Sequence, residues 1–324
     1  MNFSFSNHIL EVQGVSKYFG RKGYIVTALE NVSLTVNSSE NIAIVGETGS
    51  GKSTLGRISC GLEKPSKGKI LLSGKEIGGY KKNELWKITQ YIHQDPYGAI
   101  DSLETVREIL DRPLRFLLGI KDPNEKKELL IEALSSSGLS EDYLDKKGSD
   151  LSGGEKQRIL IARAFIVKPK YVVVDEPTTM IDFIHRDEII ETLKNEGEMF
   201  GATLLLITHD IMVVPKIAKK VAVLYKGKII EVGWTKDILK NPLHPYTTFL
   251  ASIKPSKLLG NSKILDVLNN YGQKKQSIVS QNKGCSYASI CPLADNNCIV
   301  NEPPTIEAEE NHYVKCFKPG EFQL

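Results

Sequence analysis

The sequence predicts an α/β fold, and three observations lead to this class. A Gly-rich loop at residues 46–54 follows an apolar run and precedes a predicted helix, so the order is strand, loop, helix. Two more apolar runs, residues 171–174 and 203–208, are short and continuous, which is typical of buried parallel strands. Residues 32–36 instead alternate between apolar and polar, as a half-buried strand does. We therefore expect a parallel core joined to an antiparallel part.

The remaining elements follow in chain order. Before the loop we expect strands at residues 9–19, 32–36 and 42–45, with a polar turn at 20–24, and after it a strand at 69–72. Helical spacing at 103–118 and 124–136 indicates a helical insert over about 95–150, and Pro113 should interrupt its first helix. Later segments are expected as helices at 153–167, 187–200 and 235–240 and a hairpin at 221–232. Two prolines within 241–246 then predict a boundary, followed by a small extension.

Composition narrows the class of protein. The 324 residues are 41% hydrophobic and 25% charged, as in ordinary soluble globular proteins. A net charge of +3 is too small to indicate nucleic-acid binding. No apolar run approaches the roughly 20 residues of a membrane helix, and the N-terminus does not resemble a secretory signal. We expect a cytoplasmic protein that reaches a membrane only through partners.

The Gly-rich loop carries the first chemical motif. Its pattern, G-x-x-x-x-G-K-[ST], is that of a phosphate-binding P-loop, in which backbone N–H groups and a helix N-terminus hold phosphate oxygens. Lys52 would face the β- and γ-phosphates, and the Ser53 hydroxyl would contact Mg²⁺. An accidental match in a Gly-rich loop is the alternative, and the flanking strand and helix disfavour it. The predicted nucleotide-binding residues of this loop are Gly46, Glu47, Thr48, Gly49, Ser50, Gly51, Lys52, Ser53 and Thr54.

Two acids follow the apolar run at 171–174. Asp175 and Glu176 come at the carboxyl end of a predicted buried strand, where ligands bind in open α/β sheets. We predict that Asp175 holds the Mg²⁺ shell and that Glu176 orients or deprotonates the attacking water. By themselves these residues could equally be two solvated acids at a strand end. The P-loop in the same chain favours the catalytic interpretation.

Residues 151–158, Leu-Ser-Gly-Gly-Glu-Lys-Gln-Arg, introduce a family. This segment resembles the signature sequence of the ATP-binding cassette (ABC) ATPases, although a plain turn and helix cap would also explain Ser-Gly-Gly. The resemblance covers about residues 9–240. It implies a P-loop NTPase core of the RecA-like type with an antiparallel β subdomain, within a nucleotide-binding domain at 1–245. Residues 246–324 would form a small Cys-rich C-terminal extension.

The resemblance assigns further residues. Tyr18 matches the aromatic residue that stacks on adenine, and Gln94 matches the glutamine that contacts Mg²⁺ and relays to the membrane partner. Asp182 falls at the aspartate of the D-loop, and His209 resembles the switch histidine that bonds the γ-phosphate. A lone histidine after an apolar strand is more often structural. The chain departs from the family at Glu155, where glutamine is usual, and in Thr-Met-Ile before Asp182.

The family mechanism pairs two such subunits head to tail. Ser152, Gly153 and Gly154 would then present N–H groups to the ATP held by the other subunit. The resemblance implies a homologous second ATPase subunit, expected to make a heterodimer, and two transmembrane permease subunits. An extracytoplasmic substrate-binding protein would take part indirectly. The chain would thus lie peripherally on the cytoplasmic side of the cell membrane.

The C-terminal part suggests a branch of the family. Residues 241–250 resemble the H-P-Y-T segment of oligopeptide, dipeptide and nickel importers. Peptide import is the prediction, with an oligosaccharide or nickel importer as the alternative. A soluble ABC ATPase acting in translation or DNA repair is another candidate, as is a cluster-assembly ATPase. The first usually has two cassettes or a long coiled coil, and the second generally lacks the H-P-Y-T segment.

Four cysteines gather near the end of the chain, at positions 285, 291, 298 and 316. In that importer branch a cysteine-bearing tail can hold a [4Fe–4S] cluster, which implies Cys285, Cys291, Cys298 and Cys316 as ligands. Their spacing is looser than the C-x₂-C pairs of zinc ribbons, so iron–sulfur is favoured over zinc. Four unconnected thiols are the remaining alternative. The fifth cysteine, Cys60, is expected to be a small buried residue.

Overall fold

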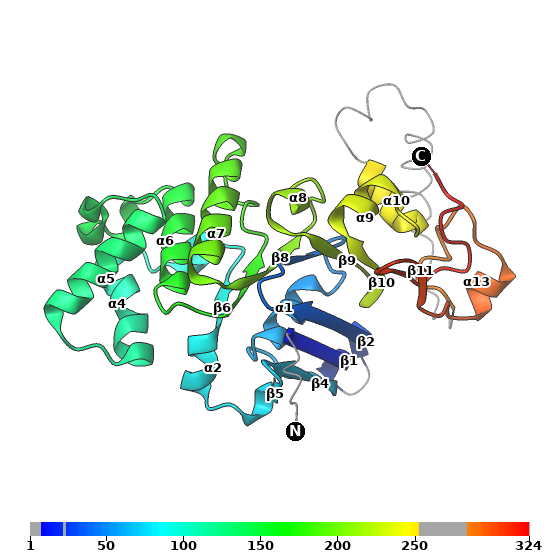
Figure 1. Ribbon diagram of the computed structural model, residues 1–324, viewed down its shortest axis with the longest axis horizontal. Helices are drawn as coiled ribbons and strands as arrows, with labels where there is room; N and C mark the ends of the chain where they lie inside the picture. Colours follow the sequence, from blue (N-terminus) through cyan, green and yellow to red (C-terminus); the bar gives the residue numbers. More distant parts are fainter. Residues whose placement is uncertain (1–7, 22–23, 253–283, 324) are drawn as a thin grey trace.

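The computed structural model describes residues 8–21, 24–252 and 284–323, which form two sheets and surrounding helices (Figure 1). The predicted extension is therefore described only in part, since residues 253–283 lie outside these ranges. The strands are β1 (His8–Arg21), β2 (Tyr24–Asn37), β3 (Ile42–Val45), β4 (Lys67–Leu72), β5 (Lys75–Glu76), β6 (Thr89–Ile92), β7 (Tyr171–Asp175), β8 (Thr203–Thr208), β9 (Lys220–Tyr225), β10 (Lys228–Trp234), β11 (Ile306–Glu309) and β12 (His312–Val314).

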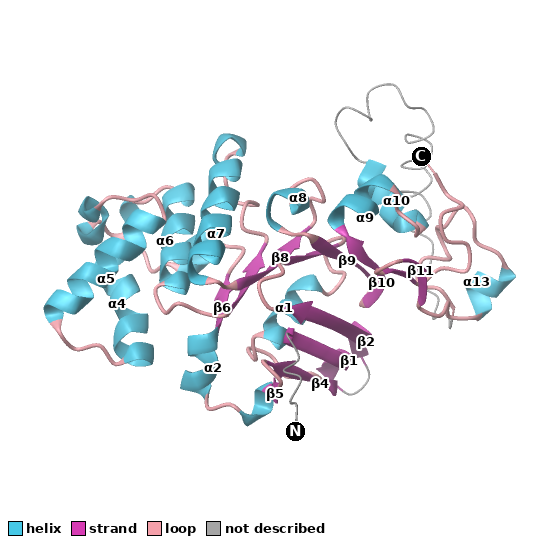
Figure 2. Cartoon of the chain, in the orientation of Figure 1, coloured by secondary structure: helices cyan, strands magenta, loops and turns pink. Residues whose placement is uncertain are grey.

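The helices follow the first three strands and are most frequent in the middle of the chain (Figure 2). They are α1 (Lys52–Ser59), α2 (Lys82–Ile88), α3 (Pro96–Ala99), α4 (Val106–Pro113), α5 (Pro123–Ser136), α6 (Gly153–Phe165), α7 (Arg186–Phe200), α8 (Val214–Ile217), α9 (Thr235–Lys240), α10 (Pro245–Ser252) and α13 (Asn296–Val300). Within the described ranges, none of these helices has the length and apolar character needed to span a bilayer.

The larger sheet organises the site. Its strand order is β11-β12-β10-β9-β3-β8-β7-β6, and β6, β7, β8, β3 and β9 run parallel. Every residue of β3, β7 and β8 is buried, because helices pack on one face of the sheet and α1 with the strands β1, β2 and β4 packs on the other. The predicted α/β class is confirmed. Since β3, β7 and β8 end at one edge, the residues that follow them meet there.

The smaller sheet is antiparallel, with order β2-β1-β4-β5. Along β2, Val32, Leu34 and Val36 are buried while the residues between them are exposed, as the alternating pattern predicts. These side chains pack with Leu55 and Ile58 of α1 in one apolar cluster. The antiparallel sheet thus supports the helix that follows the P-loop, which lies above it in Figure 1.

The helical insert lies between β6 and β7 and forms the end of the molecule away from the C-terminal strands (Figure 1). Pro113 ends α4, and the chain continues as a π-helical turn over Leu114–Leu118. The predicted interruption of the first helix is therefore a change from α-helix to a π-helical turn. It occurs at Pro113 because proline has no N–H to donate and its ring disturbs the preceding turn. Sequence reasoning did not assign α2 or β6, which are short and lack a strong period.

Regular structure does not stop at residues 241–246, where the two prolines predicted a boundary. The second proline, Pro245, begins α10 instead of ending regular structure, because proline suits the first helical turn. Farther on, β12 pairs with β10, at Glu231 with Val314 and at Val232 with Tyr313. The hairpin of β11 and β12 therefore extends the main sheet.

Candidate nucleotide-binding site

The P-loop connects β3 to α1 and leaves room for a ligand. Gly51 has φ +103, and a Cβ there would lie 2.3 Å from the carbonyl oxygen of Ala28. Gly49 has φ +81 and open space where a Cβ would be. Ser50 is buried, and its hydroxyl has no hydrogen-bond partner among the described residues. Glycines thus fix the bend, and the loop buries a hydroxyl beside Gly46 that has no partner among the described residues.

Lys52 closes the loop from inside. Its Nζ donates to the carbonyl oxygens of Gly46 at 2.8 Å and Glu47 at 2.9 Å, and the side chain is 4% exposed. Burial lowers the pKa of this ammonium, although Glu176 and Asp175 oppose the shift. The P-loop therefore holds the ammonium of Lys52 within the same loop that would bind the phosphates.

Asp175, at the end of β7, joins the loop to the sheet. The Ser53 hydroxyl donates to Asp175 Oδ1 at 3.0 Å, and the Tyr91 hydroxyl donates to Oδ2 at 2.5 Å. Burial and the nearby carboxylate raise the pKa of Tyr91 strongly, so its hydroxyl keeps its proton. Sequence reasoning missed Tyr91. On β6 it pairs with Val173 of β7, two residues before the acid, and this pairing brings its hydroxyl to Asp175.

Glu176 is the most constrained residue of the site. Its φ is +44, which is uncommon for a residue with a side chain, and its N–H donates to Ile207 on β8 at 2.8 Å. Its Oε2 accepts from Thr179 at 2.8 Å and lies 2.8 Å from His209 Nδ1, while Oε1 lies 3.8 Å from Lys52 Nζ. Thr179 was missed by sequence reasoning. The carboxylate is thus fixed between the loop lysine and His209.

The signature residues begin α6. Ser152 is the N-cap, and it exchanges hydrogen bonds with Glu155 in a capping box. Glu155 Oε1 also accepts from the Tyr143 hydroxyl, so the departure from the family glutamine has a local role. A Cβ on Gly153 would lie 2.8 Å from the Tyr97 hydroxyl, so a larger residue there would displace this exposed side chain. Within the described part of the chain, no hydrogen bond or ion pair joins Ser152, Gly153 or Gly154 to the P-loop.

Other predicted residues stand apart from these contacts. Tyr18 is half-buried on β1, with Lys67 Nζ 5.8 Å from its ring centre. Gln94 is exposed just after β6, and Asp182 is exposed with its carbonyl accepting from His185. Thr48 is exposed at the loop tip, and Thr54 is half-buried on α1. In the ranges described, none of these side chains is bonded to Lys52, Asp175 or Glu176.

The four cysteines near the end of the chain lie around one small cavity. Cys285, Cys291, Cys298 and Cys316 are free thiols that all line one cavity, together with Tyr287. Burial raises the pKa of Cys291 and Cys316 to about 11. However, no group of three or more His, Cys, Asp or Glu side chains is placed to hold a metal ion within residues 8–21, 24–252 and 284–323. The predicted iron–sulfur or zinc site is therefore not supported by this geometry. Cys60 is 2% exposed, as predicted.

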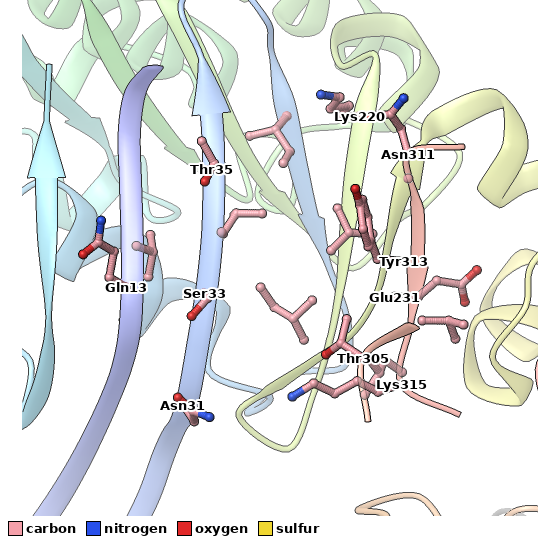
Figure 3. A pocket seen from close by; sticks show the side chains of 18 of the residues that line it. Gln13, Asn31, Ser33, Thr35, Lys220, Glu231, Thr305, Asn311, Tyr313 and Lys315 are labelled. Atoms are coloured by element: carbon pink, nitrogen blue, oxygen red, sulfur yellow. The ribbon is translucent and has the colours of Figure 1, made fainter. Parts of the chain in front are cut away.

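A cavity of about 710 Å³ lies elsewhere, between β2 on one side and β10 with β12 on the other (Figure 3). Its lining mixes neutral polar and apolar residues, with Asn31, Ser33 and Thr35 facing Tyr313 and Lys315. None of the predicted nucleotide-binding residues lines it. We therefore assign the nucleotide site from the motif contacts and not from this cavity.

Comparison with protein families gives two matches in succession. Residues 29–179 match the model described as ABC transporter, and residues 230–298 match the oligopeptide/dipeptide transporter C-terminal region. The oligopeptide transport ATP-binding protein AppF of Bacillus subtilis (strain 168) is 34% identical over 95% of this chain and 96% of the relative. AmiF of Streptococcus pneumoniae serotype 4, another oligopeptide transport ATP-binding protein, is 35% identical over 86% of this chain and 94% of the relative.

Solved structures agree with this result. A dimeric, post-hydrolysis form of the ATP-binding cassette MJ0796 with ADP and Pi has a TM-score of 0.64 at 29% identity, over 70% of this chain and 98% of that one. The cbiO1 protein of Clostridium perfringens, part of the ABC transporter complex cbiONQ, has a TM-score of 0.64 at 26% identity, over 83% of this chain and 99% of that one. The chain belongs to the ABC transporter ATPases and carries the C-terminal region of their oligopeptide/dipeptide transporter group.

Proposed function

We propose that this chain is the ATP-hydrolysing subunit of an importer for oligopeptides or dipeptides. The observation that carries the proposal is the cluster in which Glu176 lies between Lys52 and His209 beside the P-loop. The relatives named as oligopeptide transport proteins, and the matching C-terminal region, support peptides as the cargo. The chain would act on the cytoplasmic face of a membrane through permease subunits.

In this proposal each residue near the loop has one task. The P-loop N–H groups and Lys52 bind the phosphates of ATP, because a helix N-terminus and a buried ammonium attract anions. Glu176 orients water or takes its proton, and its fixed position lowers the cost of alignment. His209 bonds the γ-phosphate and, through Nδ1, holds the Glu176 carboxylate at 2.8 Å. Tyr18 stacks on adenine, and Asp182 contacts the partner subunit.

The residues around Asp175 fit Mg²⁺. A hydroxyl and a carboxylate oxygen are hard ligands of the kind this ion prefers, and Ser53 Oγ and Asp175 Oδ1 are 3.0 Å apart beside the phosphate loop. Gln94 would complete the protein's share of the ligands. When bound, Mg²⁺ would neutralise charge on the transferred phosphoryl group. Tyr91 would keep the Asp175 carboxylate aligned for it.

A second subunit would complete the site. Lys52 and Glu176 reach the phosphates from one side, while the N–H groups of Ser152, Gly153 and Gly154 are bonded to no P-loop residue among those described. A helix N-terminus of this kind can bind the terminal phosphate of ATP held by a facing subunit. A homologous, separately encoded ATPase subunit is the expected mate, with two permeases and an external substrate-binding protein completing the importer.

For the cysteine cavity we propose a structural [4Fe–4S] cluster. The donor set fits, because four thiols line one space and a cubane cluster takes four thiolates. The spacing of the cysteines, looser than the C-x₂-C pairs of zinc ribbons, favours iron–sulfur over zinc. The space holds about 20 Å³, little more than a water molecule needs, so the surrounding loops would have to open for the cluster.

The decisive experiment is to tag the chain, extract it from its native membranes and identify what is purified with it. We expect a second ABC ATPase subunit and two multispan membrane proteins, with ATP hydrolysis stimulated by a binding protein loaded with peptide. Stimulation by an oligosaccharide or by nickel instead would assign the cargo to those alternatives. A chain that stays soluble, partnerless and unable to hydrolyse ATP would contradict the proposal.

A further inference from the structure

The H-P-Y-T segment reaches the P-loop directly. The backbone N–H of Glu47 donates to the Tyr246 hydroxyl at 2.9 Å, from α10 across to the loop after β3. Tyr246 is fully buried, and its own N–H donates to His244 Nδ1 at 3.0 Å. Burial lowers the pKa of His244 to about 3, so the ring stays neutral and this nitrogen can accept. The tyrosine is thus fixed at its backbone and at its hydroxyl.

The cysteine-bearing segment packs on the same tyrosine. The ring of Tyr287 lies 5.6 Å from the ring of Tyr246, centre to centre, and both contact Tyr225. Tyr287 also lines the cysteine cavity, and its carbonyl accepts from Cys291 N at 3.1 Å. Tyr287 therefore links the cysteine cavity to the residue that holds the P-loop, beside His244 and Pro245, which also line the cavity.

The residues before α10 are also held by β10 and β12 of the main sheet. Glu231, buried on β10, accepts from the N–H groups of Leu243 at 2.8 Å and His244 at 2.9 Å. The same carboxylate lies 2.7 Å from Nε2 of His312, which belongs to β12 and is also buried. The segment before Tyr246 cannot shift without disturbing this arrangement, so the extension acts as a fixed support.

We propose that Tyr246 is a positioning residue of the P-loop, and that the cysteine-bearing segment holds it in place through Tyr287. The proposal rests on the proposed function, because it assumes that this loop binds ATP. The Glu47 N–H lies at the start of the loop, where its direction sets the path of the N–H groups that follow. Loss of the hydroxyl leaves that N–H without this partner and lets the loop adopt other arrangements before ATP binds.

The test compares Tyr246→Phe with Tyr80→Phe in the purified transporter. The control also removes one tyrosine hydroxyl bonded to a backbone group, Leu72 O at 2.8 Å. A lost hydrogen bond of about 1 kcal/mol predicts a rise of about fivefold in the KM for ATP in Tyr246→Phe. We expect kcat to stay within twofold, because the ordered loop is restored once ATP binds. Tyr80→Phe should match the wild type in both constants.

The role of the cysteine segment is tested by a double-mutant cycle. Tyr287→Leu should raise the KM for ATP in the same direction as Tyr246→Phe, and the two changes together should give less than the product of the single effects. Independent, multiplying effects would overturn the link between the segments. An unchanged KM in Tyr246→Phe, or an equal rise in Tyr80→Phe, would overturn the positioning role. In each case a wild-type transporter that hydrolyses ATP leaves the proposed function standing, whereas an inactive wild type refutes that function itself.

Discussion

His209 Nδ1 lies 2.8 Å from Oε2 of Glu176, so the histidine after β8 and the acid after β7 act on each other directly. The remaining oxygen of that carboxylate lies 3.8 Å from Lys52 Nζ of the P-loop. Three strands that are distant in the sequence therefore bring one base, one cation and one hydrogen-bonding ring to a single point. This arrangement supports the chemistry proposed for the chain.

Replacing Glu176 with glutamine should separate ATP binding from hydrolysis. The amide keeps the size of the side chain but cannot accept a proton, and general-base catalysis contributes about 10²–10⁴-fold to rates. We expect ATP affinity within a few-fold of the wild type, turnover at least 100-fold slower, and a trapped closed pair. Steady-state hydrolysis and equilibrium nucleotide binding measure these. Glu141→Gln, at an exposed ion pair with Lys127, is the control and should retain wild-type turnover. Unchanged turnover in Glu176→Gln would show that this carboxylate is not the base.

Tyr91→Phe should raise the Mg²⁺ concentration that ATP hydrolysis requires. The variant removes the hydroxyl that donates to Asp175 Oδ2 and leaves the ring in place. Hydrogen bonds to charged groups are worth about 1.5–3 kcal/mol, but solvent and Mg²⁺ replace part of this one. We expect the Mg²⁺ concentration for half-maximal hydrolysis to rise by about 3–10-fold. Titration of activity with Mg²⁺ at saturating ATP gives the value, and an identical curve would exclude a role for this hydroxyl.

Cys291→Ser should abolish visible absorbance of protein purified without oxygen. A [4Fe–4S] cluster takes four thiolates, and serine oxygen is a poor substitute for one of them. Cys60→Ala serves as the control because Cys60 directly follows α1 and does not line the cysteine cavity, so the change should leave the spectrum unchanged. Iron content and absorbance are measured together. Normal iron and absorbance in Cys291→Ser would rule out this cysteine as a required ligand.

The pair of Glu231 and His312 predicts a pH dependence of stability. Burial lowers the pKa of His312, but the hydrogen bond and charge of Glu231, with the charge of Glu309, outweigh it and leave the pKa raised. A raised folded-state pKa stabilises the fold below the ordinary histidine value of about 6.5, and this stabilisation is lost as the pH rises through the raised value. We expect the melting temperature to fall on going from mildly acidic to alkaline pH. His312→Gln should flatten this change, and an identical pH profile in the variant would contradict the assignment.

The central residues of the site could be predicted from the sequence because each of them lies at or just after the end of a strand. The P-loop, Asp175 with Glu176, and His209 each follow a short buried run, and a parallel sheet brings such ends to one edge. Tyr91 and Tyr246 were missed, since their contacts depend on packing between distant segments. Thr179 was missed although it lies only three residues after Glu176, because its contact depends on the local turn of the chain after β7. The cysteine cavity was predicted as a group, but its geometry was not, because spacing along a loop does not fix distances between thiols. Pro245 shows the same limit, as proline can either end or begin a helix.

The central claim is that the signature segment of a facing subunit completes the ATP-binding site formed by this P-loop. The most direct measurement is ATP binding and hydrolysis by the assembled transporter carrying Ser152→Arg in both ATPase subunits, at the matching position in the mate. The account predicts near wild-type ATP affinity, hydrolysis reduced at least ~100-fold, and no closure of the pair with ATP. The melting temperature should fall by only a few degrees, as the loss of the Ser152 helix cap predicts. Hydrolysis at the wild-type rate in a folded variant of this kind would contradict it.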